Sequence, residues 1–120
     1  MAVSAKLYLT VFALLLVAGA TAPYGVEAQV TCDTVNTDLG PCGSYVLIGI
    51  GPSSDCCNGL KSLLSAASTQ TDRQTVCSCL KSLASSVNDA QLARAASIPD
   101  KCDATIPFTI SRDVDCSAVQ

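Results

Sequence analysis

Residues 71–83, TDRQTVCSCLKSL, decide the fold, because they place two cysteines, separated by one residue, in a segment of helical periodicity. Positions i and i+2 of an α-helix lie about 200° apart around its axis, so Cys77 and Cys79 point to opposite sides. Cys56 and Cys57 form a second doublet, and adjacent helical positions diverge by about 100°. Each doublet must therefore connect its helix to two different parts of the chain.

The N-terminal segment has the features of a secretory signal peptide. Lys6 supplies a short positive region, residues 7–18 form an apolar run, and the small residues of VEA at 26–28 fit a cleavage site. The apolar run is short and wrongly flanked for a spanning helix, so a retained membrane anchor is the less favoured alternative. We expect residues 1–28 to be a signal peptide and residues 29–120 to form one secreted domain.

All of the cysteines lie in the expected mature chain, at Cys32, Cys42, Cys56, Cys57, Cys77, Cys79, Cys102 and Cys116. An even number of cysteines in a short secreted chain indicates a disulfide framework, although spacing alone does not choose the pairs. The sequence has no histidine and no Cys-x-x-Cys pair, the arrangement that structural zinc sites favour. We therefore expect disulfides, and neither a metal nor any other cofactor.

Hydrophobic periodicity predicts four helices followed by an irregular tail. The expected helices cover residues 31–47, residues 54–68, a stretch from Thr71 to a break at 87–89, and residues 89–97. Pro41 should kink the first helix, and Pro99 should follow the end of the last one. From Lys101 onward no helical period remains, so this segment is expected to be ordered but irregular.

Helix starts can be assigned from capping residues. Ser53 or Ser54 can cap the second helix, and Asn88 can cap the fourth. Thr71, followed three residues later by Gln74, matches a capping box for the third helix.

The charge and the residue types exclude two broad classes of function. The chain has seven basic and ten acidic residues, of which Lys6 and Glu27 belong to the expected signal peptide, so the net charge of −3 is unchanged by cleavage. An acidic domain is a poor binder of nucleic acid. The usual nucleophile–base pairs are missing, since there is no histidine and the cysteines are expected in bridges, so we do not expect an enzyme.

The full cysteine pattern resembles a known family. Its order, C-x9-C-x13-CC-x19-C-x-C-x22-C-x13-C, is accompanied by CGSY at 42–45, TDRQ at 71–74, SIPDKC at 97–102 and IPFTIS at 106–111. This is similar to the eight-cysteine motif of plant non-specific lipid-transfer proteins of type 1, over essentially the whole mature chain. The resemblance implies four pairs: Cys32 with Cys79, Cys42 with Cys56, Cys57 with Cys102, and Cys77 with Cys116.

The resemblance also implies an all-α fold, a four-helix disulfide-stapled bundle with an irregular C-terminal tail around a hydrophobic tunnel. Such a tunnel holds fatty acids, lysolipids and the acyl chains of phospholipids. The family further implies a monomeric carrier in the cell wall or apoplast, with transient membrane contact and roles in cutin or wax deposition or in defence. Helical periodicity alone favours a small solid core instead. The only aromatic residues after residue 28 are Tyr45 and Phe108, and this scarcity makes an unfilled interior tolerable.

Specific residues can be assigned to the implied tunnel. Arg73 matches the family's arginine at the tunnel mouth and is expected to meet the polar head of a lipid, with Asp72 supporting the helix start. The alternative for this pair is a solvated salt bridge. Phe108 replaces the family's usual tyrosine, which suggests a weaker hold on the head, and Tyr45 is a wall or packing residue. The expected walls are Val35, Leu39, Leu60, Leu63, Leu64, Val76, Leu80, Leu83, Ile98, Ile106 and Ile110.

Two alternative functions remain open from the sequence. Enzyme inhibitors and seed-storage albumins share a related eight-cysteine framework, but they lack the combined TDRQ and IPFTIS pieces at these spacings. An antimicrobial membrane-active protein normally carries a cationic face, whereas this chain is acidic. The remaining cations that we considered, Lys61, Lys81, Arg94 and Lys101, are expected to be ordinary exposed helix charges, although Lys101 could neighbour a headgroup.

Overall fold

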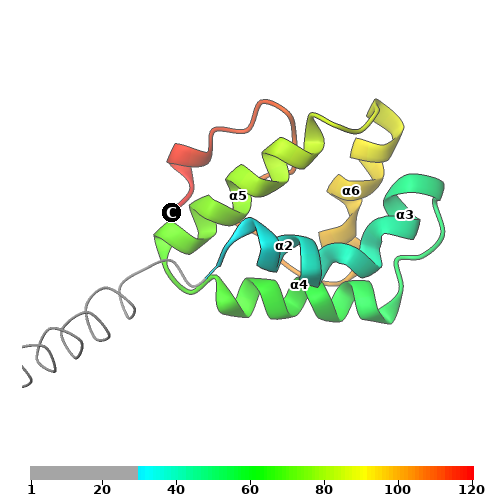
Figure 1. Cartoon of the computed structure of the whole chain (residues 1–120), viewed down its shortest axis with the longest axis horizontal. Coiled ribbons are helices and arrows are strands. Elements are labelled where there is room, and N and C mark those ends of the chain that lie inside the picture. The colour runs from blue at the N-terminus through cyan, green and yellow to red at the C-terminus, as the bar shows by residue number, and fades with distance from the viewer. Residues whose placement is uncertain (1–29) are drawn as a thin grey trace, which may run out of the picture.

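A computed structural model describes residues 30–120, so the expected signal peptide at 1–28 lies outside the described residues. These residues form helices and no strands (Figure 1). The elements are α2 (Cys32–Leu39), the 3₁₀ helix η1 (Gly40–Cys42), α3 (Gly43–Ile48), α4 (Ser54–Ala66), α5 (Gln70–Ala84), α6 (Asp89–Lys101) and the 3₁₀ helix η2 (Cys116–Ala118). The predicted all-α fold is confirmed. No helix in this part of the chain is long and apolar enough to cross a membrane.

The first predicted helix is divided, as expected from its proline. Pro41 lies in η1, where the chain changes from α-helical to 3₁₀ geometry before it continues as α3. Proline has no backbone N–H and its ring disturbs the preceding turn, so it interrupts a regular helix. Gly49 then ends α3 in the left-handed region, with φ of 80°, which is a common way for glycine to end a helix.

Two details of the helix boundaries differ from the prediction. Helix α5 is capped by Thr69, whose hydroxyl accepts from the Asp72 amide at 3.0 Å, so the capping box at Thr71 is wrong. Thr69 and Thr71 both carry a hydroxyl group that can cap a helix, and the sequence pattern does not indicate which of them does so. Gln74 instead donates its side-chain amide to the Val119 carbonyl at 3.1 Å.

Helix α6 also extends beyond its predicted end. It runs through Pro99 to Lys101, whereas we expected it to end at residue 97. The Cys102 amide donates to the Ile98 carbonyl at 2.9 Å, and the Ala104 amide donates to the Pro99 carbonyl at 2.9 Å. These bonds on the C-terminal side of the proline keep the last turn closed. The predicted cap at Asn88 is confirmed, and it forms a reciprocal capping box with Gln91.

Four disulfides connect the helices, and they join the pairs that the family resemblance implies. The doublet on α4 reaches η1 through Cys56 and the end of α6 through Cys57. The doublet on α5 reaches α2 through Cys79 and η2 through Cys77. Each doublet therefore links its helix to two separate segments. Each bridge typically contributes about 2–4 kcal/mol to stability.

Close helix packing depends on one glycine. Helix α2 lies against α4, and a Cβ atom added at Gly59 would collide with the main-chain carbonyl of Asp38. Glycine in the middle of a helix is normally unfavourable by about 1 kcal/mol relative to alanine. Its presence here is explained by the approach of the two backbones.

The C-terminal tail is held across the helices by side chains that bind main-chain carbonyls. Arg112 donates to Ala84 at 3.2 Å and to Val87 at 2.7 Å, and forms an ion pair with Asp89 at 2.6 Å. Val119, near the end of the chain, is buried. These contacts fix the segment between Cys102 and Cys116 as an outer wall over the helices.

Candidate functional site

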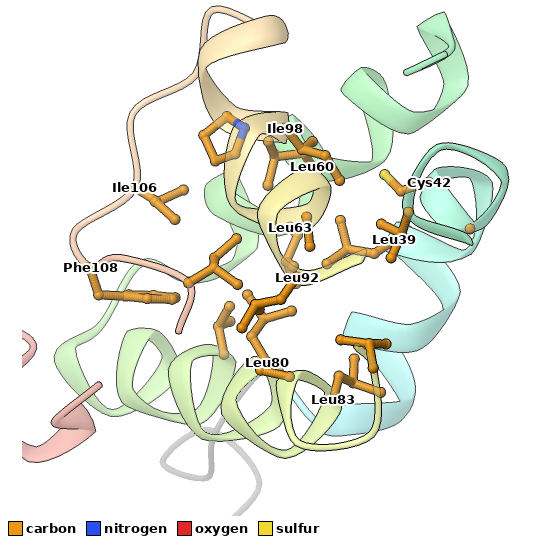
Figure 2. Close-up of a pocket in the computed structure, with 18 of the residues that line it drawn as sticks. Leu39, Cys42, Leu60, Leu63, Leu80, Leu83, Leu92, Ile98, Ile106 and Phe108 are labelled. Atoms are coloured by element: carbon orange, nitrogen blue, oxygen red, sulfur yellow. The ribbon is translucent and has the colours of Figure 1, made fainter. Parts of the chain in front are cut away.

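The helices and the tail surround a cavity of about 270 Å³ (Figure 2). This volume is near the lower end of the range found for small-molecule sites. The lining is drawn from η1, from every α-helix and from the tail. It consists of Leu39, Cys42, Gly43, Val46, Leu47, Leu60, Leu63, Leu64, Val76, Leu80, Leu83, Ala84, Ser86, Val87, Leu92, Ala95, Ile98, Pro99, Ile106, Phe108 and Ile110.

The chemistry of this lining is almost entirely hydrocarbon. Ser86 is the one lining residue with a polar side chain, and its hydroxyl already donates to the Leu83 carbonyl at 2.8 Å. None of the lining residues is charged. A polar group placed here would lose its hydrogen bonds to water without replacement, whereas an alkyl chain would gain contacts. The cavity is therefore suited to an apolar ligand and to no proton-transfer or metal chemistry.

The structure brings most of the predicted wall residues together. Those that line the cavity are Leu39, Leu60, Leu63, Leu64, Val76, Leu80, Leu83, Ile98, Ile106, Phe108 and Ile110. Four predicted site residues are absent from its lining: Val35, Tyr45, Asp72 and Arg73.

Val35 and Tyr45 have packing roles instead. Val35 is fully buried and packs against other buried side chains beside the cavity. Tyr45 is also buried, and its hydroxyl lies 2.7 Å from the Ser97 hydroxyl, which links α3 to α6. The ammonium group of Lys101 lies 6.0 Å from the centre of the Tyr45 ring, at the outer limit of a cation–π contact.

Asp72 and Arg73 secure the start of α5. Asp72 lies in the first turn of α5 and is fully buried, and its carboxylate accepts from the Val30 amide at 3.4 Å, so this carboxylate is not solvated. Arg73 donates to the main-chain carbonyls of Gln120 at 2.5 Å and Ala67 at 3.4 Å. The guanidinium therefore ties the turn before α5 to the C-terminus, and its role with a lipid head stays a prediction.

Phe108 lies between the apolar cavity and a second, more polar hollow. The second hollow has a volume of about 330 Å³ and is bordered by Asp100, Thr105 and Thr109. It shares Pro99, Ile106, Phe108 and Ile110 with the main cavity. Figure 2 shows the Phe108 ring extending from the tail toward the other residues that line the cavity, and this ring lacks the hydroxyl group that a tyrosine would add.

Several residues that line the cavity were not predicted from the sequence. Leu92 and Ala95 precede the predicted Ile98 at steps of three residues, so the α6 stripe could have revealed them. Val46 lies within the first predicted helix and Val87 at the predicted end of the third, but neither was assigned to the wall.

The expectation of an ordinary exposed charge at Arg94 is wrong. This side chain is half-buried, and it donates to the Val46 carbonyl at 2.9 Å and to the Leu47 carbonyl at 3.2 Å. It therefore holds the C-terminal end of α3 against α6.

The clearest electrostatic perturbation in the described residues lies outside the cavity lining. The side-chain hydroxyl and the amide of Ser117 both donate to the carboxylate of Asp115, and these bonds lower the pKa of Asp115. This interaction caps η2 and stabilises the charged carboxylate at the end of the tail.

An all-helical domain stapled by four disulfides around a hydrocarbon-lined cavity defines a class of small, cysteine-rich helical proteins with an internal apolar site. Residues 32–116 match the family model described as the protease inhibitor/seed storage/LTP family, and the chain belongs to this family. It is 50% identical over 109 residues to non-specific lipid-transfer protein 2 of rice, Oryza sativa subsp. indica, covering 91% of this chain and 90% of the rice protein.

Comparison with solved structures also finds members of this family. The chain is similar to barley non-specific lipid transfer protein 1 in complex with lysophosphatidylcholine, with a TM-score of 0.70 and 46% identity, covering 76% of this chain and 100% of the barley chain. It is also similar to the wheat non-specific transfer protein complexed with two molecules of phospholipid, with a TM-score of 0.68 and 44% identity, covering 75% of this chain and 100% of the wheat chain.

Proposed function

We propose that this protein binds lipids by their acyl chains inside the cavity and transfers them between surfaces. The observation that carries this proposal is a cavity whose lining contains no charged residue and one already bonded hydroxyl. Fatty acids, lysolipids and the acyl chains of phospholipids have the matching chemistry. The barley and wheat structures, with lysophosphatidylcholine and phospholipid, support the same ligand class.

The driving force is the removal of the acyl chain from water. Each buried CH₂ contributes about 0.8 kcal/mol, so a chain of about twelve methylenes gives on the order of 10 kcal/mol before losses. Association and ordering of the ligand offset a large part of this sum. Because the favourable term depends on the chain and not on the head, broad specificity among lipids is expected.

Selectivity among headgroups should be weak and should come from two residues, Arg73 at the start of α5 and Phe108 in the tail. We place Arg73 as the residue that meets a carboxylate or phosphate, since a guanidinium can bind either through two parallel hydrogen bonds. In the structure this side chain donates to the carbonyl groups of Gln120 and Ala67, so it would exchange those partners for the ligand. Phe108 cannot donate a hydrogen bond, which weakens the hold on the polar end.

The proposed activity is carriage and not catalysis. The sequence contains no histidine, and all eight cysteines are in disulfides, so the usual pairs of a serine or cysteine nucleophile with a histidine base cannot form. Transfer of a lipid requires no covalent step. The family placement supports this reading, because the relatives described above are lipid-transfer proteins.

We also propose that the protein acts outside the cell. Residues 1–28 have the pattern of a secretory signal, and four disulfides persist best in an oxidising compartment. Delivery of lipid monomers such as those of cutin or wax to the cell wall would use this location.

Uptake of a fluorescent fatty acid by the oxidised protein tests the proposal. The complete sequence is expressed in a secreting yeast host, and the N-terminus of the product is read by mass spectrometry. We expect saturable fluorescence enhancement that lysophosphatidylcholine reverses, and loss of uptake after reduction and alkylation of the cysteines. Absence of uptake by the oxidised protein would refute lipid carriage, and enzyme inhibition without uptake would support the inhibitor alternative.

A further inference from the structure

An exposed apolar rim lies at one end of the molecule, formed by Leu47, Ile48 and Ile50 at the end of α3 and by Leu83 near the end of α5. Their side chains are 56%, 66%, 66% and 44% exposed, and they are the large hydrophobic residues most open to solvent in the described part of the chain. Single exposed apolar residues are ordinary, but three within four positions form a patch, and such patches mark interaction surfaces.

The apolar rim is continuous with the cavity. Leu47 and Leu83 both line the cavity while being exposed to solvent, so the cavity reaches the surface between α3 and the end of α5. Ser86 and Val87, in the turn that follows α5, line the same side. A ligand chain entering here would pass directly from the surface into the hydrocarbon-lined interior.

The α3 part of the rim, Leu47, Ile48 and Ile50, lies in an uncharged stretch of the chain. Residues 39–54 contain no Asp, Glu, Lys or Arg. The neighbouring cation, Arg94, donates to the Val46 and Leu47 carbonyls. The Gly49 amide bonds to the Tyr45 carbonyl at 2.9 Å, and the Ile50 amide bonds to the Ser44 carbonyl at 3.4 Å. Entry into an apolar medium is unfavourable for charges and unpaired amides, and this segment offers few of either.

We propose that the apolar rim inserts into the surface of a zwitterionic lipid bilayer and admits the acyl chain from there. This inference rests on the proposed function, because the bilayer is the source of the ligand that the cavity holds. A bilayer matches a rim whose own side chains are all apolar and which opens into the cavity. The net charge of −3 opposes approach to anionic surfaces, so a zwitterionic membrane is the favoured one.

A single-tryptophan reporter tests the insertion. The sequence contains no tryptophan, so Ile50→Trp introduces one fluorophore at the rim. Ala66→Trp is the control, since Ala66 is exposed at the end of α4 farthest from α3 (Figure 1). With phosphatidylcholine vesicles, we expect a blue shift and quenching by brominated lipid for Ile50→Trp, and no response for Ala66→Trp. Equal responses of the two variants, or none from Ile50→Trp, would overturn the proposal.

A transfer assay separates docking from lipid binding. Neither Ile48 nor Ile50 lines the cavity, so Ile48→Ser/Ile50→Ser should keep the wild-type affinity for a fatty acid in solution. Its rate of lipid uptake from phosphatidylcholine vesicles should fall by about tenfold or more, because two apolar side chains no longer enter the bilayer. Ile48→Leu/Ile50→Leu, which keeps the apolar surface, should transfer at the wild-type rate.

The outcomes distinguish the two proposals. Normal fatty-acid uptake with an unchanged vesicle rate in the serine variant would refute docking by the rim and leave lipid carriage intact. Failure of the wild-type protein to take up fatty acid from solution would refute the carrier function itself. Concentration-dependent dimerisation that the serine variant abolishes, without any vesicle response, would assign the rim to a second copy of the chain and overturn membrane docking.

Discussion

Replacing Ala95 by leucine tests whether the interior is open space or packed core. Ala95 lies within α6 and lines the cavity. In a filled core, extra carbon atoms force distortions that cost about 1–3 kcal/mol. In an open cavity, the three added carbons are buried without a clash, and each contributes about 0.8 kcal/mol. Leucine is nearly as good a helix former as alanine, so we expect the free energy of unfolding of the lipid-free protein to rise by about 2 kcal/mol.

The same substitution should weaken lipid binding. The three added carbons occupy space that about three methylenes of the ligand would fill in the wild-type cavity. The loss is about 2 kcal/mol, which corresponds to roughly a thirtyfold increase in the dissociation constant. Stability and affinity should therefore move in opposite directions, a result that a packed core does not produce.

Ala93→Leu is the matched control, because Ala93 is exposed on the same helix and does not line the cavity. Unfolding of both oxidised, lipid-free variants in guanidinium chloride is followed by circular dichroism, and affinity is measured with a fluorescent fatty acid. The control should leave both quantities close to the wild-type values. Destabilisation by Ala95→Leu, with affinity unchanged, would refute an open cavity at this position.

Three further substitutions address the proposed headgroup contacts and the packing of the helices. Arg73→Ala should retain most of its affinity for acyl chains but lose part of any preference for anionic heads, and an unchanged preference in competition assays would remove Arg73 from headgroup binding. Phe108→Tyr should tighten binding of polar-headed lipids by adding a hydroxyl group at the boundary with the polar hollow, and equal or poorer affinity would contradict this. Gly59→Ala should lower the free energy of unfolding by about 2 kcal/mol or more, because the new methyl group collides with the Asp38 carbonyl. A stabilised variant in guanidinium unfolding would show that helix propensity dominates there.

The helices were predictable because each carries one apolar face and recognisable ends. The predicted helix boundaries were wrong where the residue types near a helix end allowed more than one position for that end. Thr69 and Thr71 present the same hydroxyl two residues apart, and only the folded chain shows that Thr69 binds the Asp72 amide. Pro99 signals a helix end, but bonds from Cys102 and Ala104 continue the turn around it. These bonds join residues only three to five positions apart, but which of them form depends on the backbone path of the folded chain and not on the residue types alone.

The candidate site was harder to predict than the helices. Periodicity identifies the face of a helix that points inward, but a side chain facing a cavity and one facing a packed neighbour have the same pattern. Leu63 and Val35 are both fully buried on helix stripes, yet only Leu63 lines the cavity. Ile106 and Ile110 are in the irregular tail, so their place in the wall came from the family resemblance and not from a period. Arg94 was missed because its partners are carbonyl groups of α3, which no pattern of side chains indicates.

The cysteine doublets explain how a small domain keeps its interior open. At about 24 cal/mol per Å³, a cavity of about 270 Å³ costs on the order of 6 kcal/mol, comparable with what two or three disulfides contribute. Cys56 and Cys57 join α4 to η1 and to the end of α6, while Cys77 and Cys79 join α5 to η2 and α2. Opposing walls of the cavity are thus connected by covalent bonds that diverge from two helices. Inward collapse to fill the cavity would have to strain these bridges, so the divergence of Cys77 and Cys79 helps to keep the lipid site open.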